Sequence, residues 1–355
     1  MKPTERRYDI DWLRVIAIGL LIMYHIGFVF LPWGVFIGFI QNEDSLESLW
    51  IPMSMVNIWR IPLLFFVSGM GVCFAIRRRN WKQLIMERTR RILLPFLFGI
   101  LCVVPLHLFI WQKYYSQDIT YSVQPSHLWF LANIFIYVVL LSPLFFFLRR
   151  NGNGRIYRGL TRIYSSPLGL LLTTIVFLLE AMLVNPESYE TYSMTLHGFL
   201  LGLLAFLFGF IFVYTDEAFW QNVKKWRWVL LTAAIALFLV RHFVFQLQAP
   251  GYYKAIESCM WIYAVFGFGY TYLNHSSRSL AYLSSAAYPV YILHMIFLYT
   301  GSSLIAGLAL SPCYKFILLL IFTITACFVA YELIIKRVGF LRPLFGLKRS
   351  MTALE

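Results

Sequence analysis

Charged residues are scarce in this chain of 355 residues: Asp, Glu, Lys and Arg make up 13%, about half the share that soluble domains carry. Hydrophobic residues make up 60%, and the mean hydropathy is +0.71. These proportions exclude an ordinary soluble globular domain. Period-two alternation of polar and apolar residues is also absent, and a transmembrane β-barrel would require it. The apolar runs, most of them near 20 residues long, predict an all-α, polytopic integral membrane protein embedded in a lipid bilayer.

The sequence also lacks the patterns of several soluble enzyme classes. It contains no GxSxG, no P-loop, no HExxH and no glycine-rich dinucleotide-binding pattern. Its five cysteines show no CxxC spacing and nearly all lie in apolar runs, so we expect neither a disulfide framework nor a metal site. The first apolar segment is too long for a signal-peptide core and lacks a small-residue cleavage site, so we expect no cleaved signal.

Ten apolar segments predict ten transmembrane helices in one membrane domain, 1–355, with no appended soluble domain. Their approximate ranges are 11–33, 50–76, 92–112, 127–148, 166–185, 196–214, 228–247, 257–273, 281–306 and 312–335.

The net charge of +14 lies mainly in the connectors and at the two ends, which include Lys2 and Arg349. Most of the 30 basic residues fall on one side of the predicted membrane, in the ends and in the connectors at 77–91, 149–162, 224–227 and 278. By the positive-inside rule both termini are therefore cytoplasmic. Because membrane orientation accounts for these charges, we expect no nucleic acid partner.

Arg14 and His25 lie eleven residues apart in the first apolar segment, DIDWLRVIAIGLLIMYHIGFVFLP. Eleven residues are almost three helical turns, so both side chains fall on one face, separated by about 16 Å along the axis. Ionisable residues inside a membrane helix usually face a polar cavity or a partner. The pair therefore predicts a polar track. The alternative is an arginine that reaches the membrane interface and a histidine bonded to a neighbouring helix.

Other ionisable residues fall within the predicted spans. Asp11 lies three residues before Arg14 and can pair with it. The remaining residues that we expect around a cavity are Arg60, Glu180, Arg241 and His294. Static salt bridges, such as Arg241 with Glu180 or Glu257, are the alternative for several of them, because a buried charge requires a partner whatever the function.

Arg88 and Arg91 lie three residues apart in the basic connector before the third span. On a helix such a pair faces one way and presents two guanidinium groups to phosphate oxygens. Ordinary charge at a span boundary is the alternative.

Together these patterns resemble the acyltransferase-3 family of ten-helix bacterial membrane acyltransferases. Arg14 and His25 match its Arg-x10-His signature, and Arg88 and Arg91 match its Arg-x-x-Arg motif. Further segments similar to the family are RIPLLFFVSGMG (60–71), SHLWFL (126–131), which contains Trp129, and AAYPVYILHM (286–295). The C-terminal segment YELIIKRVGFLRPLFGLK (331–348) is similar to the glucan biosynthesis protein C branch.

The resemblance implies a multi-pass protein of the bacterial inner membrane. It would transfer an acyl group from cytoplasmic acyl-CoA, as acetyl-CoA or succinyl-CoA, to a hydroxyl of an extracytoplasmic glycan or lipid-linked sugar. His25 would be the general base, while Arg14, Arg88 and Arg91 would bind the acyl-CoA, with Asp11 orienting Arg14. Arg60, Arg241, His294, Glu180 and Trp129 would line the cavity or position the acceptor. No metal is required.

Two other functions fit parts of the pattern. A transporter or flippase for an anionic amphiphile would use the same cavity without bond formation, although no convincing repeat relates spans 1–5 to spans 6–10. A structural subunit that holds other glycan enzymes would leave the polar track without a role.

Overall fold

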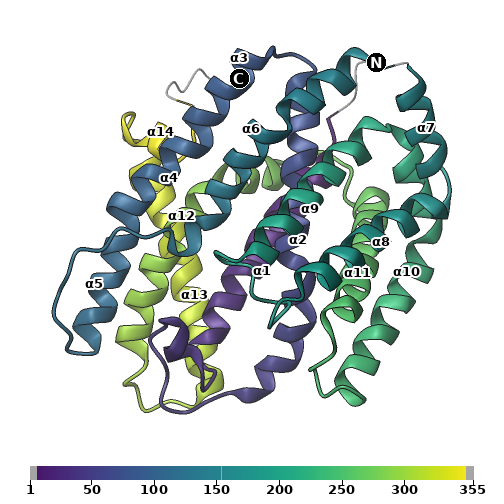
Figure 1. The fold of residues 1–355 in the computed structure, drawn as a ribbon. Helices are drawn as coiled ribbons and strands as arrows, with labels where there is room; N and C mark the ends of the chain where they lie inside the picture. The colour runs from purple at the N-terminus through teal and green to yellow at the C-terminus, as the bar shows by residue number, and fades with distance from the viewer. Residues whose placement is uncertain (1–5, 153, 349–355) are drawn as a thin grey trace. The chain divides into compact units, whose positions relative to one another are not determined.

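The structure is a computed structural model that describes residues 6–152 and 154–348. Within these residues every regular element is a helix and no strand occurs, which confirms the all-α prediction. The terminal residues Lys2 and Arg349 lie outside the described part. The α-helices are α1 (Tyr8–Phe28), α2 (Trp50–Ile76), α3 (Trp81–Arg88), α4 (Leu94–Phe98), α5 (Val104–Tyr114), α6 (Trp129–Arg150), α7 (Arg155–Tyr164), α8 (Pro167–Val184), α9 (Leu196–Tyr214), α10 (Glu217–Phe243), α11 (Gly251–Tyr272), α12 (Arg278–Ile305), α13 (Pro312–Ala330) and α14 (Leu341–Leu344) (Figure 1).

Eight helical segments of the described chain are long and apolar enough to cross a membrane. They are Tyr8–Phe28, Glu47–Ile76, Trp81–Tyr114, Ser126–Arg150, Pro167–Val184, Leu196–Tyr214, Arg278–Ile305 and Pro312–Ile335. The helices α10 and α11 occupy the places where the sequence predicts the seventh and eighth spans. Both are long enough to cross, with 27 and 22 residues, but they do not belong to the eight segments that are both long and apolar enough.

Local sequence explains where several helices begin and end. Helix α8 begins with Pro167, whose ring fixes a helical φ and whose missing N–H is not needed in the first turn. The same helix is followed by Asn185, which adopts the left-handed conformation that asparagine tolerates. Helix α9 is capped by Thr195, whose side chain accepts a hydrogen bond from the Gly198 N–H.

In the described part of the chain, three π-helical turns interrupt the α-helical geometry, at Thr89–Leu93, Gly99–Val103 and Tyr331–Ile335. The first two join α3, α4 and α5 into one continuous helical segment. Arg91 lies in the first of these turns and Arg88 directly before it. The sequence predicted an ordinary helix for this pair, whereas the π turn has more residues per turn, so the directions of the two side chains do not follow from three-residue spacing.

The chain divides into two compact units. Of the described residues, the first contains those within 1–17, 54–86 and 133–281, and the second contains those within 18–53, 87–132 and 282–355.

In the first unit, glycines let two helix backbones touch. A Cβ atom on Gly69 of α2 would lie 1.9 Å from the Phe206 carbonyl oxygen of α9. Reciprocally, a Cβ on Gly209 of α9 would lie 2.0 Å from the Phe66 carbonyl oxygen of α2. Neither position has room for a side chain, so α2 and α9 pack at close range, as small residues allow in membrane helices. Elsewhere in this unit α10 packs along α11 (Figure 1).

In the second unit, loops are tied to helices by buried polar groups. The Tyr299 hydroxyl of α12 donates to the Gly38 carbonyl at 2.6 Å. The buried Lys315 ammonium of α13 donates to the Asn42 side chain at 3.1 Å and to the Ala306 carbonyl at 2.7 Å. These bonds fix the segment that follows α1, and with it the end of the helix that carries His25.

Candidate functional site

His25 and His294 meet in the second unit. The His25 Nδ1 and His294 Nε2 atoms are 2.8 Å apart, and the two rings stack with centroids 5.1 Å apart and planes inclined by 7°. His294 is fully buried, whereas His25 is half-buried. The sequence named both residues but could not pair them, because 269 positions separate them.

The hydrogen bonds of His294 define the proton positions of the pair. Its Nδ1 atom is 2.6 Å from the carbonyl oxygen of Tyr291, one turn earlier on α12. A carbonyl only accepts, so Nδ1–H donates to it. In a neutral imidazole the other nitrogen then accepts, and His25 Nδ1–H donates to His294 Nε2. The Nε2 atom of neutral His25 therefore carries the basic lone pair.

Two further histidines surround this pair, and the sequence predicted no role for them. The ring of buried His127 lies perpendicular to that of His294, with centroids 5.0 Å apart. Its Nε2–H donates to the Ile292 carbonyl at 3.1 Å, and the Tyr291 hydroxyl donates to the His127 carbonyl. The ring of buried His107 lies 5.7 Å from that of His127. The signal in the sequence was the presence of both histidines in apolar surroundings, although their distance along the chain from His25 and His294 concealed their proximity.

The bonds from His294 to the Tyr291 carbonyl and from His127 to the Ile292 carbonyl each use one ring N–H. Among the described residues, no group of three or more His, Cys, Asp or Glu side chains is arranged to hold a metal ion.

Arg88 and Arg91 also belong to the second unit, and both act electrostatically on the Tyr288 phenol. The Tyr288 hydroxyl is buried without a hydrogen-bond partner among the described residues. Arg91 forms an ion pair with Glu87 at 3.1 Å. Tyr288, Tyr291 and His294 follow one another at three-residue spacing on α12. This helix therefore connects the arginine pair with the histidine pair over about 9 Å of axial rise.

Trp129 begins α6 in this unit and is buried. The ring of the next residue, Phe130, packs edge-on against Tyr291, with centroids 6.4 Å apart. Trp129 therefore belongs to the same packed region as the histidine cluster.

Arg14 and Asp11 lie on the part of α1 that belongs to the first unit. Their predicted pairing is confirmed, with Arg14 Nη1 3.3 Å from Asp11 Oδ1. Asp11 also pairs with Arg6 at 3.0 Å. The Arg14 guanidinium lies over Gly71 of α2, where a Cβ would be 3.8 Å from Nη2.

The remaining predicted residues lie in the first unit as pairs. Arg241, completely buried, donates through Nε and Nη2 to both carboxylate oxygens of Glu257, at 2.6 and 2.9 Å, and through Nη2 to the Ser54 carbonyl at 3.1 Å. Of the two partners considered from the sequence, Glu257 is the one observed. Glu180 instead lies 2.9 Å from His197 Nδ1.

Arg60 of α2 is buried and donates to the Asn57 side chain at 3.2 Å.

The predicted site residues are divided between the two units. Asp11, Arg14, Arg60, Glu180 and Arg241 belong to the first, and His25, Arg88, Arg91, Trp129 and His294 belong to the second.

Comparison with known proteins identifies the chain's relatives. A family model described as an acyltransferase domain, that of acyltransferase-3, matches residues 7–332. The chain belongs to the acyltransferase-3 family. Neither the curated proteins nor the solved structures contain a match. The family and the apolar helices together define the chain as a multi-pass membrane acyltransferase.

Proposed function

We propose that this acyltransferase-3 protein transfers an acetyl or succinyl group from cytoplasmic acyl-CoA to a hydroxyl of an extracytoplasmic glycan or lipid-linked sugar, with His25 as the general base. The observation that carries the proposal is the bond between His25 Nδ1 and His294 Nε2. A histidine used as a base must present one unprotonated nitrogen in a fixed direction. The Tyr291 carbonyl, acting through His294, supports both requirements.

In the proposed reaction His25 takes up one proton and later releases it. His25 Nε2 accepts the proton of the acceptor hydroxyl as its oxygen attacks the thioester carbonyl. The C–S bond then breaks, and His25 returns the proton to the leaving thiolate, so the products are an ester and a free thiol. While His25 is protonated, its Nδ1–H remains donated to His294, which keeps the ring in place. In this scheme His294 is a positioning residue.

Cationic residues support the assignment of an anionic donor. Arg88 and Arg91 offer guanidinium groups to phosphate oxygens, and the buried Tyr288 hydroxyl nearby offers one further donor. We assign Arg14 to the same donor, with Asp11 holding its guanidinium. The 16 Å or so of α1 between Arg14 and His25 is of the same order as an extended phosphopantetheine arm.

The proposal includes topology and location. The helices α10 and α11 would complete ten spans, with both termini cytoplasmic by the positive-inside rule. The buried pair of Arg241 in α10 and Glu257 in α11 leaves neither of these two charges without a partner. The protein would then lie in a bacterial inner membrane. The similarity of residues 331–348 to the glucan biosynthesis branch favours succinyl over acetyl and a glucan as acceptor.

The test is acyl transfer by the purified protein in nanodiscs, supplied with acetyl-CoA or succinyl-CoA and a panel of glycans. Thiol release and the mass of the acceptor are measured together. We expect His25→Ala to lower turnover by about 10²–10⁴-fold, the usual contribution of a general base. The control is His275→Ala, which removes an exposed histidine from the connector before α12. Wild-type turnover by a folded His25→Ala protein would contradict the assignment.

The same preparation distinguishes the transporter alternative. Movement of an anionic amphiphile across a proteoliposome membrane without thiol release would favour transport. Thiol release that matches acceptor acylation one to one would favour transfer.

A further inference from the structure

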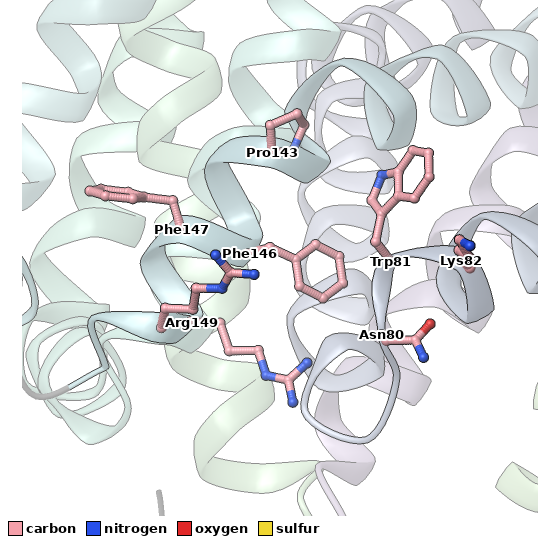
Figure 2. Close-up of a pocket in the computed structure, with 8 residues that line it drawn as sticks. Asn80, Trp81, Lys82, Pro143, Phe146, Phe147 and Arg149 are labelled. Carbon is pink, nitrogen blue, oxygen red and sulfur yellow. The ribbon is translucent and has the colours of Figure 1, made fainter.

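An open pocket of about 870 Å³ lies in the first unit where α6 ends and α3 begins. Its lining consists of Asn80, Trp81, Lys82, Pro143, Phe146, Phe147, Arg149 and Arg150. Figure 2 shows the Phe146 ring and the Trp81 indole extending into the space between the two helices, with Phe147 pointing away from Trp81. None of these residues belongs to the candidate site above.

The charge of the pocket is of one sign. Lys82, Arg149 and Arg150 are basic, and no acidic residue lines it. Arg149 is held in place, because it donates to the Arg79 carbonyl at 2.8 Å and lies over the Phe146 ring. Lys82 and Arg150 are exposed and form no salt bridge with any residue that the structure describes. The pocket therefore favours an anion.

The walls of the pocket are apolar and accessible. Trp81 and Phe147 are each 51% exposed, and the exposed surface continues along α6 through Leu144 and Leu140. The Trp81 indole is oriented by its N–H, which donates to Ser142 of α6 at 3.0 Å. A free anion such as phosphate would leave these apolar walls uncovered. An amphiphile with an anionic head and apolar chains would cover both parts.

We propose that this pocket binds an anionic phospholipid of the leaflet next to the basic connectors. Its phosphate would lie among Lys82, Arg149 and Arg150, and one acyl chain would follow Phe146, Phe147 and Leu144 along α6. Basic pockets at the membrane boundary bind such headgroups, each basic residue near the surface contributing about 1 kcal/mol. Aromatic rings stabilise this boundary because they are apolar with a polar edge. The proposal goes beyond acyl transfer and does not depend on it.

The test is lipid retention by the intact protein. Protein purified from nanodiscs that contain equal amounts of phosphatidylglycerol and phosphatidylcholine is analysed by native mass spectrometry. We expect wild type to retain phosphatidylglycerol in preference to phosphatidylcholine. Lys82→Gln with Arg150→Gln should lower that preference about 25-fold, which is about fivefold for each cation. Arg149 is left unchanged because it also holds the Arg79 carbonyl.

The matched control is Arg155→Gln with Arg158→Gln, which removes the same charge from exposed positions of α7 outside the pocket. Equal losses in the two double variants would overturn the proposal, since they would indicate general attraction to anionic lipid. Equal retention of the two lipids by wild type would also overturn it.

A second measurement tests the proposal without changing the charge of the pocket. Brominated phosphatidylglycerol should quench the tryptophan fluorescence of wild type more than that of Trp81→Phe, and brominated phosphatidylcholine should quench both alike. Displacement of the bound lipid by micromolar CoA or inorganic phosphate would instead assign the pocket to a soluble anion and exclude the lipid.

Discussion

The buried ion pair between Arg241 and Glu257 gives the sharpest prediction about stability. Both side chains are completely buried, and Arg241 bonds both oxygens of Glu257. Arg241→Leu leaves the Glu257 carboxylate buried without its cation. We expect a loss of about 3–5 kcal/mol, the usual cost of removing one partner of a buried pair. The double variant, with Leu also at position 257, removes both charges and should recover most of the loss.

Thermal unfolding in nanodiscs measures this effect for wild type, both single variants and the double variant. Because membrane proteins often unfold irreversibly, all four are compared at one heating rate. Thiol release at a temperature where all four are folded reports activity separately. If the two single costs simply add in the double variant, the pair does not act as a unit and the reasoning is refuted. If Arg241→Leu stays stable but loses turnover, Arg241 takes part in the reaction, as the sequence first suggested.

Four further predictions concern the site and the packing. His294→Leu should lower kcat about 10²-fold and alter the pH profile of kcat/KM, whereas His294→Gln should retain more of kcat because its side-chain oxygen can accept from His25 Nδ1–H. Equal loss in both variants would argue against the positioning role. Arg14→Gln should raise the KM for acyl-CoA more than it lowers kcat, as initial rates over a range of donor concentration would show, whereas an unchanged KM would remove Arg14 from the donor site. Gly209→Ala forces a methyl group against the Phe66 carbonyl and should cost about 1–3 kcal/mol in thermal unfolding, while Gly19→Ala, which meets nothing within 4 Å, should be neutral. Burial, followed by the neighbouring Asp216 carboxylate, raises the pKa of Tyr157 in α7, so the contribution of Tyr157 to stability is complete below the ordinary tyrosine pKa of about 10 and falls as the pH rises through the folded value. Tyr157→Phe should therefore weaken the dependence of the melting temperature on pH between these two values, and an unchanged dependence would count against this contact.

The helical class could be predicted from the sequence, and eight of the ten predicted spans correspond to helical segments of the described chain that are long and apolar enough to cross a membrane. Such apolar runs depend on local composition. It also predicted the Asp11–Arg14 pair, since three residues on one helix determine that distance. It did not predict the π turn beneath Arg91, which arises from an extra residue in a turn and leaves no periodic signal.

Contacts between segments that are distant in the chain could not be predicted from the sequence. His127 and His107 gather near His294 only because α5, the start of α6 and α12 fold into one unit. The choice between Glu180 and Glu257 for Arg241 likewise depended on which helix faces α10. Spacing along the chain carries no information on either point. The His294 tautomer follows from a contact in space, because the Tyr291 carbonyl 2.6 Å from Nδ1 can only accept a hydrogen bond.

The contact of α2 with α9 restricts how the first unit can move. At Gly69 and Gly209 the main chain of each helix rests against the other, with no flexible side chain between them to deform. Sliding or rocking of one helix past the other would bring the backbones into collision at two points. A rocking cycle that exposes a cavity to each side of the membrane in turn would therefore have to carry α2 and α9 together as one rigid body.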